Sequence, residues 1–162
     1  MLYPFCSNHD CRDDANPSGA LVMDSAGALW GTTENADGEN GVVFNLEQSG
    51  ARWQESVVHR FCRPTCEDGY APSGGLVADA SGRFYGTDQF GGTGDQGIGA
   101  GTAFLLSGGS FRTIYEFCAE TGCTDGMLPV GTLLVDPGGA LFGVTTMGGE
   151  SGQQGTIFEL TP

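Results

Sequence analysis

The sequence contains no lysine. Its six basic residues are all arginines and stand against 20 aspartates and glutamates, so the formal net charge is −14 at pH 7. A surface with this charge repels a phosphate backbone, and we therefore expect no nucleic-acid partner. We interpret the acidic balance as a solvated surface rather than as a cation-binding signal.

Long hydrophobic runs are also missing. No stretch of 18 apolar residues occurs, so no transmembrane segment is expected. Helical periodicity is absent, and charged residues make up only 16% of a chain that contains 29 glycines. This composition is typical of short β-strands joined by many turns.

Internal repetition is what the chain does have. The pair Phe-Cys begins at residues 5, 61 and 117, at intervals of 56 residues, and the residues behind it recur in the same order. The recurring positions are Cys11/Cys66/Cys123, Asp13/Asp68/Asp125, Pro17/Pro72/Pro129, Leu21/Leu76/Leu133, Asp24/Asp79/Asp136, Gly27/Gly82/Gly139, Trp30-Gly31/Tyr85-Gly86/Phe142-Gly143, Phe44/Phe104/Phe158 and Leu46/Leu106/Leu160. A fixed period of this length indicates one supersecondary unit copied in tandem, as a repeat array or a closed ring.

Each repeat carries four short apolar segments separated by glycine-rich turns. In the first repeat the predicted strands cover residues 19–24, 28–33, 41–46 and 53–61. Four antiparallel strands in a unit of this size are typical of a β-propeller blade. The sequence thus predicts one all-β, β-propeller-like repeat domain over residues 1–162, with blade units of residues 6–61, 62–117, and 118–162 plus 1–5.

The third repeat stops at its third strand, residues 155–160. Residues 2–5 align with residues 58–61 and 114–117, so we expect this N-terminal strand to complete the last blade. Pro4 lacks a backbone N–H, which fits an edge strand. Propellers have four to eight blades, which leaves three alternatives: a two-chain ring, a head-to-tail filament, or a fragment of a longer array. Because Leu2 already matches repeat sequence, we expect a mature form or part of a longer reading frame.

The six cysteines fall into three local pairs, one in each repeat: Cys6/Cys11, Cys62/Cys66 and Cys118/Cys123. This regularity predicts three disulfides within repeats, formed outside the reducing cytosol. Zinc binding is the alternative, but no second Cys or His pair lies nearby in the sequence.

The combined motifs resemble a known type of repeat. Phe-Cys…Cys-x-Asp, Pro-x-x-x-Leu-x-x-Asp-x-x-Gly-x-Leu-Trp-Gly-Thr-Thr and Gly-Val-Val-Phe-x-Leu are similar to the GloVer-type tandem repeats of bacterial surface and secreted proteins. The three copies cover essentially the whole chain. The resemblance implies export, often with a cell-surface anchor, and a propeller-like all-β build, but it implies no assigned reaction.

The recurring aspartates are interpreted as framework. Asp24, Asp79 and Asp136 precede glycine turns and are expected to accept hydrogen bonds from turn amides, while Asp13, Asp68 and Asp125 are expected to cap the disulfide loops. A calcium site is the alternative at one loop, where Asn35, Asp37 and Glu39 place oxygen side chains around a glycine bend. We expect no other cofactor.

Support for catalysis is thin. His9 and His59 are the only histidines, and His59 stands where the other repeats have Tyr3 and Tyr115. We align Glu34, Asp88 and Thr145 after the aromatic–glycine pairs, and these three residues do not supply a repeated carboxylate pair. We therefore name no catalytic residue.

Binding is easier to support. Variation concentrates in the loops between the second and third strands, and Phe90 and Met147 are candidate ligand contacts there. The sequence favours a non-catalytic secreted or cell-surface module for binding or self-assembly. Its expected partners are a second copy of itself, through N-terminal strand exchange, and polysaccharide. The alternative is a carbohydrate-active or lyase-type propeller enzyme.

Overall fold

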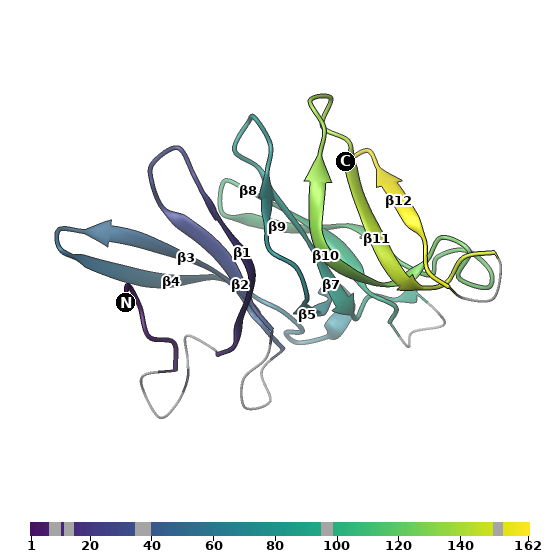
Figure 1. Ribbon diagram of the computed structural model, residues 1–162. Helices are drawn as coiled ribbons and strands as arrows, with labels where there is room; N and C mark the ends of the chain where they lie inside the picture. The colour runs from purple at the N-terminus through teal and green to yellow at the C-terminus, as the bar shows by residue number, and fades with distance from the viewer. Residues whose placement is uncertain (7–10, 12–14, 35–39, 95–98, 151–153) are drawn as a thin grey trace.

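The computed structural model describes residues 1–6, 11, 15–34, 40–94, 99–150 and 154–162. These residues form three antiparallel sheets that lie side by side (Figure 1). The all-β class predicted from the sequence is confirmed. In the described ranges, no helix is long and apolar enough to cross a membrane.

Each repeat contributes one sheet, with strands that pair in chain order. The first sheet contains β1 (Pro17–Met23), β2 (Leu29–Thr33), β3 (Val42–Ser49) and β4 (Arg52–Arg60). The second follows the 3-10 turn η1 (Cys66–Asp68) and contains β5 (Tyr70–Pro72), β6 (Val77–Ala78), β7 (Phe84–Phe90), β8 (Thr102–Ser107) and β9 (Ser110–Glu116), with both β5 and β6 pairing with β7. The third contains β10 (Met127–Val135), β11 (Leu141–Met147) and β12 (Ile157–Leu160).

The first strand of every repeat is broken at the same place. The β1–β2 register shifts between Ser18 and Val22, and the β10–β11 register shifts between Val130 and Leu134. In the second repeat the same break divides the strand into β5 and β6. Gly19 and Gly131 lie at this position with φ of 76° and 75°, a conformation that glycine adopts without a Cβ penalty.

The glycine after the repeated aromatic residue makes room for a buried ring. Gly31, Gly86 and Gly143 lie directly opposite Phe44, Phe104 and Phe158 on the third strand of each sheet. A Cβ on any of these glycines would overlap the ring of its phenylalanine. The recurrence of both residues in the sequence thus follows from one close contact per repeat.

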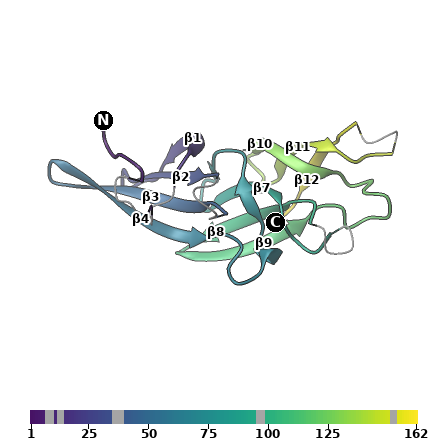
Figure 2. The ribbon, with the colours of Figure 1, turned by 90° about the horizontal axis from the view of Figure 1, so that it is seen from below.

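The core lies between the sheets. Leu76, Phe84 and Phe104 of the second sheet pack against Val43 and the partly buried Trp30 of the first. Leu133 and Leu141 of the third sheet pack in the same way against Tyr85 and Leu105 of the second. Figure 2 shows the resulting succession, with β1–β4 at one end of the molecule and β10–β12 at the other. Each repeat covers a face of its neighbour.

Within a single chain the N-terminal segment does not pair with β12, so its role as the strand that completes the last blade stays a prediction that needs a second copy. Residues 1–6 form no strand, and the termini lie far apart (Figure 1). The segment packs on the first sheet, where the ring of Phe5 lies 4.8 Å from that of Phe44. This position is held by an aromatic contact that recurs in the chain. Phe5 packs on Phe44 in the same way as Phe61 contacts Phe104 and Phe117 contacts Phe158.

We expect Gly86→Ala to lower the free energy of unfolding by ~1–3 kcal/mol, because the added methyl group meets the fully buried ring of Phe104. Urea denaturation measures this cost. In the double variant Gly86→Ala/Phe104→Leu the loss in free energy of unfolding should be smaller than the sum of the losses in the two single variants, because the smaller side chain relieves the overlap. Strict additivity would show that overlap with Phe104 is not the cause.

Candidate functional site

The aspartate before each glycine turn is part of the framework. The Oδ1 of Asp24 accepts hydrogen bonds from the backbone N–H groups of Ala26 and Ala28, both at 2.9 Å. Asp136 accepts one from Ala140 at 2.8 Å. The hydrogen bond from the Trp30 indole N–H, followed by those from the turn amides, holds the pKa of Asp24 below its ordinary range.

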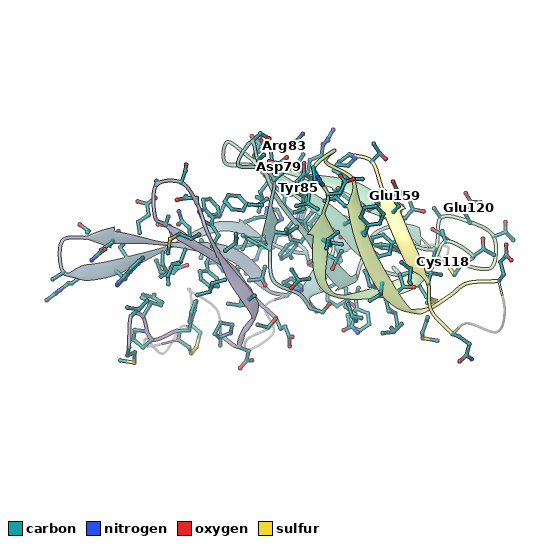
Figure 3. All side chains as sticks on the ribbon, turned by 45° about the horizontal axis from the view of Figure 1, so that its top comes forward. Asp79, Arg83, Tyr85, Cys118, Glu120 and Glu159 are labelled. Atoms are coloured by element: carbon teal, nitrogen blue, oxygen red, sulfur yellow. A yellow bond between two sulfur atoms is a disulfide. The ribbon has the colours of Figure 1, made fainter. Side chains whose placement is uncertain are left out.

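The second turn carries a denser cluster, which Figure 3 shows with Asp79, Arg83 and Tyr85 gathered together. Arg83 Nε lies 2.6 Å from Asp79 Oδ2, and the Tyr85 hydroxyl donates to the same oxygen at 3.2 Å. Burial raises the pKa of Asp79, but hydrogen bonds from Arg83 and Ser81 outweigh it, and the net pKa lies well below the ordinary range. These groups satisfy one another, so the cluster stabilises the turn.

An aspartate also stabilises the disulfide loops of the second and third repeats. The structure joins Cys6 to Cys11, Cys62 to Cys66 and Cys118 to Cys123. In the second repeat the carboxylate of Asp68 accepts a hydrogen bond from the Cys62 N–H at 2.9 Å. In the third repeat Asp125 accepts one from the Ala119 N–H, also at 2.9 Å. Both aspartates cap their loops, whereas Asp13 lies outside the described residues.

His59 takes the place that Tyr115 holds in the next repeat. Its Nε2 lies 2.9 Å from Asp68, and the Tyr115 hydroxyl donates to Asp125 at 2.8 Å. The imidazole stacks on Phe111 with the ring centroids 3.7 Å apart. Burial lowers the pKa of His59, although the bond to Asp68 opposes that shift. A ring that packs and caps a loop in two repeats is a structural element, and His9 lies outside the described residues.

The candidate ligand residues fall partly elsewhere than predicted. Asn35, Asp37 and Glu39, the calcium alternative, lie outside the described residues. Phe90 and Met147 are the last residues of β7 and β11 and precede the loops in which the sequence placed them. Phe90 stacks on Tyr70 with ring centroids 5.3 Å apart, whereas Met147 is exposed. The second strand of these two repeats extends further than the sequence predicted, so both residues belong to the strand and not to the loop.

Two grooves separate the aspartate turns of successive repeats. A groove of ≈ 510 Å³ between the first and second repeats is lined by Asp24, Trp30, Asp79 and Phe84 among others. A second groove of ≈ 450 Å³ between the second and third repeats contains Asp79, Arg83 and Asp136. Both combine turn hydroxyls and carboxylates with apolar walls, which is suited to an uncharged polar ligand.

The two outer sheets expose large apolar side chains that the sequence did not identify as surface residues. Leu21 on the first sheet is 53% exposed, whereas the aligned Leu76 and Leu133 are 3% and 5% exposed. On the third sheet Ile157 is 84% exposed and Leu134 is 61% exposed. The sequence could not show this exposure, because Leu21 and Ile157 occupy recurring apolar positions that are buried in the other repeats.

A carboxyl group lies buried in the second sheet. Asp88 is completely buried, accepts a hydrogen bond from Thr102 Oγ1 at 3.0 Å, and has no described partner at Oδ1. Burial, opposed by the Thr102 hydrogen bond, holds the pKa of Asp88 well above its usual range. The sheet register aligns Asp88 with Thr33 and not with Glu34, which corrects our sequence alignment. Thr33 and Thr145 both accept a backbone N–H at the same place.

Comparison with known proteins identifies a repeat family. A family model described as the Gloeobacter/Verrucomicrobia repeat matches residues 2–162. No curated protein matches the chain. The family match spans all three repeats, in agreement with the resemblance seen in the sequence.

We expect the intact mass of the unreduced protein to be lower than that of the reduced protein by six hydrogen atoms, because three disulfides form. Intact mass spectrometry in denaturant measures this difference. A thiol-reactive label should add nothing without a reductant and six labels after reduction. Six free thiols in the unreduced, folded protein would contradict the pairing.

We expect Asp88→Thr to stabilise the protein at neutral pH. A carboxyl group with a raised pKa in the folded state stabilises the fold fully below its unfolded pKa of about 3.9, and that contribution disappears as the pH rises toward the folded value. The slope from one such group is at most about 1.4 kcal/mol per pH unit. Urea denaturation across this pH range should show the decline in the wild type and a smaller decline in the variant.

Asp79→Asn is the matched control for this experiment. The pKa of Asp79 is lowered in the folded state, so the stability that its carboxylate contributes is present above the unfolded pKa and is lost on acidification. The control should therefore lose stability at neutral pH. A destabilised Asp88→Thr variant at neutral pH would show that the buried carboxyl group makes a favourable contact instead.

Proposed function

This chain belongs to the Gloeobacter/Verrucomicrobia repeat family, and from that premise we propose that it is a non-catalytic secreted or cell-surface module that acts by binding or self-assembly. The repeated polar residues support this proposal. Aspartates such as Asp24 and Asp79 are occupied by hydrogen bonds within their own turns. These recurring aspartates therefore stabilise the fold, and we place the function of the chain in its exposed surfaces.

One observation carries the proposal. Large apolar side chains are exposed on both outer sheets at positions that pack between sheets elsewhere in the chain. Leu21 and Ile157 are the clearest cases. Exposing such side chains to water costs about 1.5–3 kcal/mol each relative to burial. A module with two such faces is suited to making contacts.

We further propose that the repeats are blades of a β-propeller, in units of residues 6–61, 62–117, and 118–162 plus 1–5. The support is the chain-order pairing of each sheet and the meeting of the first strands. Ser18 Oγ donates to the Pro72 carbonyl at 3.3 Å, and Ser73 Oγ donates to the Pro129 carbonyl at 3.1 Å. First strands that bond to one another would form the wall of a central axis.

The cysteine chemistry supports the proposed extracellular location. All six cysteines are joined in local pairs, and such bonds persist in oxidising compartments. Each pair closes a short loop, so it holds a local turn more than it stabilises the whole domain. The disulfides thereby protect the capped loops that lead into each repeat.

Polysaccharide is the ligand class that suits the grooves between the turns. Trp30 and Phe84 stack with centroids 4.6 Å apart in the wall of the larger groove, beside Asp24, Asp79 and Ser81. Aromatic surface beside hydroxyl and carboxylate oxygens fits a sugar. A carbohydrate-active or lyase-type enzyme would use the same groove, but its carboxylates are bound within turns, which favours binding over acid–base catalysis.

We expect the folded protein to retain bacterial polysaccharides without cutting them. The measurement is incubation with a polysaccharide panel, followed by assay of bound sugar and of new chain ends. The expected result is retention of at least one polysaccharide, or association between protein molecules, with no new chain ends. Release of shortened chains that grows with time and protein concentration would overturn the non-catalytic proposal.

A further inference from the structure

We propose that the outer face of the third sheet binds the outer face of the first sheet of a second copy of this chain, and that residues 2–5 of that copy pair with β12. This inference rests on the proposed function and names its partner. The chain already contains two interfaces of the same kind, between its first and second and between its second and third sheets. These two internal interfaces are the template for the proposed contact between copies.

The side chains of the template interfaces have exposed counterparts on the outer faces. On the receiving side, Leu76 and Leu133 insert against the preceding sheet, and Leu21 holds this position on the first sheet. On the opposite side, Val43 and Ala103 are fully buried, and Ile157 is aligned with them. The two outer faces are therefore the two halves of an interface that the chain makes twice internally.

The last strand of each repeat links the two kinds of contact. Residue His59 pairs with Val43 of its own sheet, and the imidazole of His59 stacks on Phe111 of the next sheet. Tyr115 pairs with Ala103 in the same register. By the same alignment, Tyr3 of the second copy would lie opposite Ile157.

The backbone provides a more specific expectation. The Phe61 N–H donates to the Gly41 carbonyl at 3.1 Å, and the Phe117 N–H donates to the Gly101 carbonyl at 2.9 Å. The Phe5 N–H of the second copy would donate to the carbonyl of Gly155 in the same way. This arrangement joins the N-terminal segment of one copy to the open side of β12 in another.

Pro4 fits this register. Hydrogen-bonded and non-hydrogen-bonded pairs alternate along an antiparallel ladder. Since Phe61 is hydrogen-bonded to Gly41, the next pair, Arg60 with Val42, is non-hydrogen-bonded. Pro4 aligns with Arg60, so its missing N–H would face outward and remove no ladder bond.

Both surfaces are hollowed. A groove of ≈ 620 Å³ follows β12 and is lined by residues 155–160 among others. A smaller groove of ≈ 220 Å³ on the first sheet is lined by Phe5, Leu21 and Phe44 among others. Because the two halves differ, the contact is heterologous: two copies close a ring of six repeats, or many copies form an open polymer.

The test uses two variants, Leu21→Asp and Ile157→Asp, each of which damages one face and leaves the other intact. Native mass spectrometry with light scattering should show dimers or larger assemblies for the wild type and monomers for each variant alone. An equimolar mixture of the two variants should form a one-to-one dimer, because each supplies the face that the other lacks. Both positions are exposed in the single chain, so we expect both variants to fold.

Ser110→Asp, an exposed substitution in the second sheet, is the control and should assemble as the wild type does. Circular dichroism and urea denaturation check that all three variants fold. A monomeric wild type over the micromolar range, or a mixture of variants that stays monomeric, would overturn the inference. That result would leave polysaccharide binding intact, whereas cleavage of polysaccharide would overturn the proposed function and leave assembly intact.

Discussion

The burial of one sheet face against the next repeat is the contact on which the rest of the structure depends. A sheet of three to five short strands has too little core of its own, so it must cover its apolar face with another layer. Leu76 and Leu133 supply this contact from the broken first strand of each following repeat. The break in the first strand and the glycine opposite the phenylalanine both position side chains for that interface.

The polar residues that recur with this interface hold it in place. Asp24, Asp79 and Asp136 accept hydrogen bonds from their turns, and Asp68 and Asp125 accept them from their disulfide loops. A buried or half-buried carboxylate without such donors would be costly. The second and third repeats thereby fix both ends of their first strands, and the buried Leu76 and Leu133 between those ends have little freedom to move.

The second repeat departs from this plan at Asp88. Thr33 and Thr145 accept a backbone N–H at the equivalent place, and the carboxyl group of Asp88 substitutes for their hydroxyl with one oxygen unpartnered. Thr33 and Asp88 are both completely buried and Thr145 is nearly so, so this position is desolvated in all three repeats. The raised pKa of Asp88 follows from the presence of a carboxyl group at a position where the other two repeats have a hydroxyl.

Periodicity in the amino-acid sequence determined the all-β class, the three repeats, the strand order within each sheet, the cysteine pairs and the family. These properties depend on local patterns of apolar residues, glycines and caps, which each repeat carries in full. Tertiary structure alone decided where the N-terminal segment lies and that His59 stacks on Phe111. It also decided which copies of a recurring apolar position are buried, because Leu21, Leu76 and Leu133 are alike in sequence and differ only in whether a neighbouring sheet covers them.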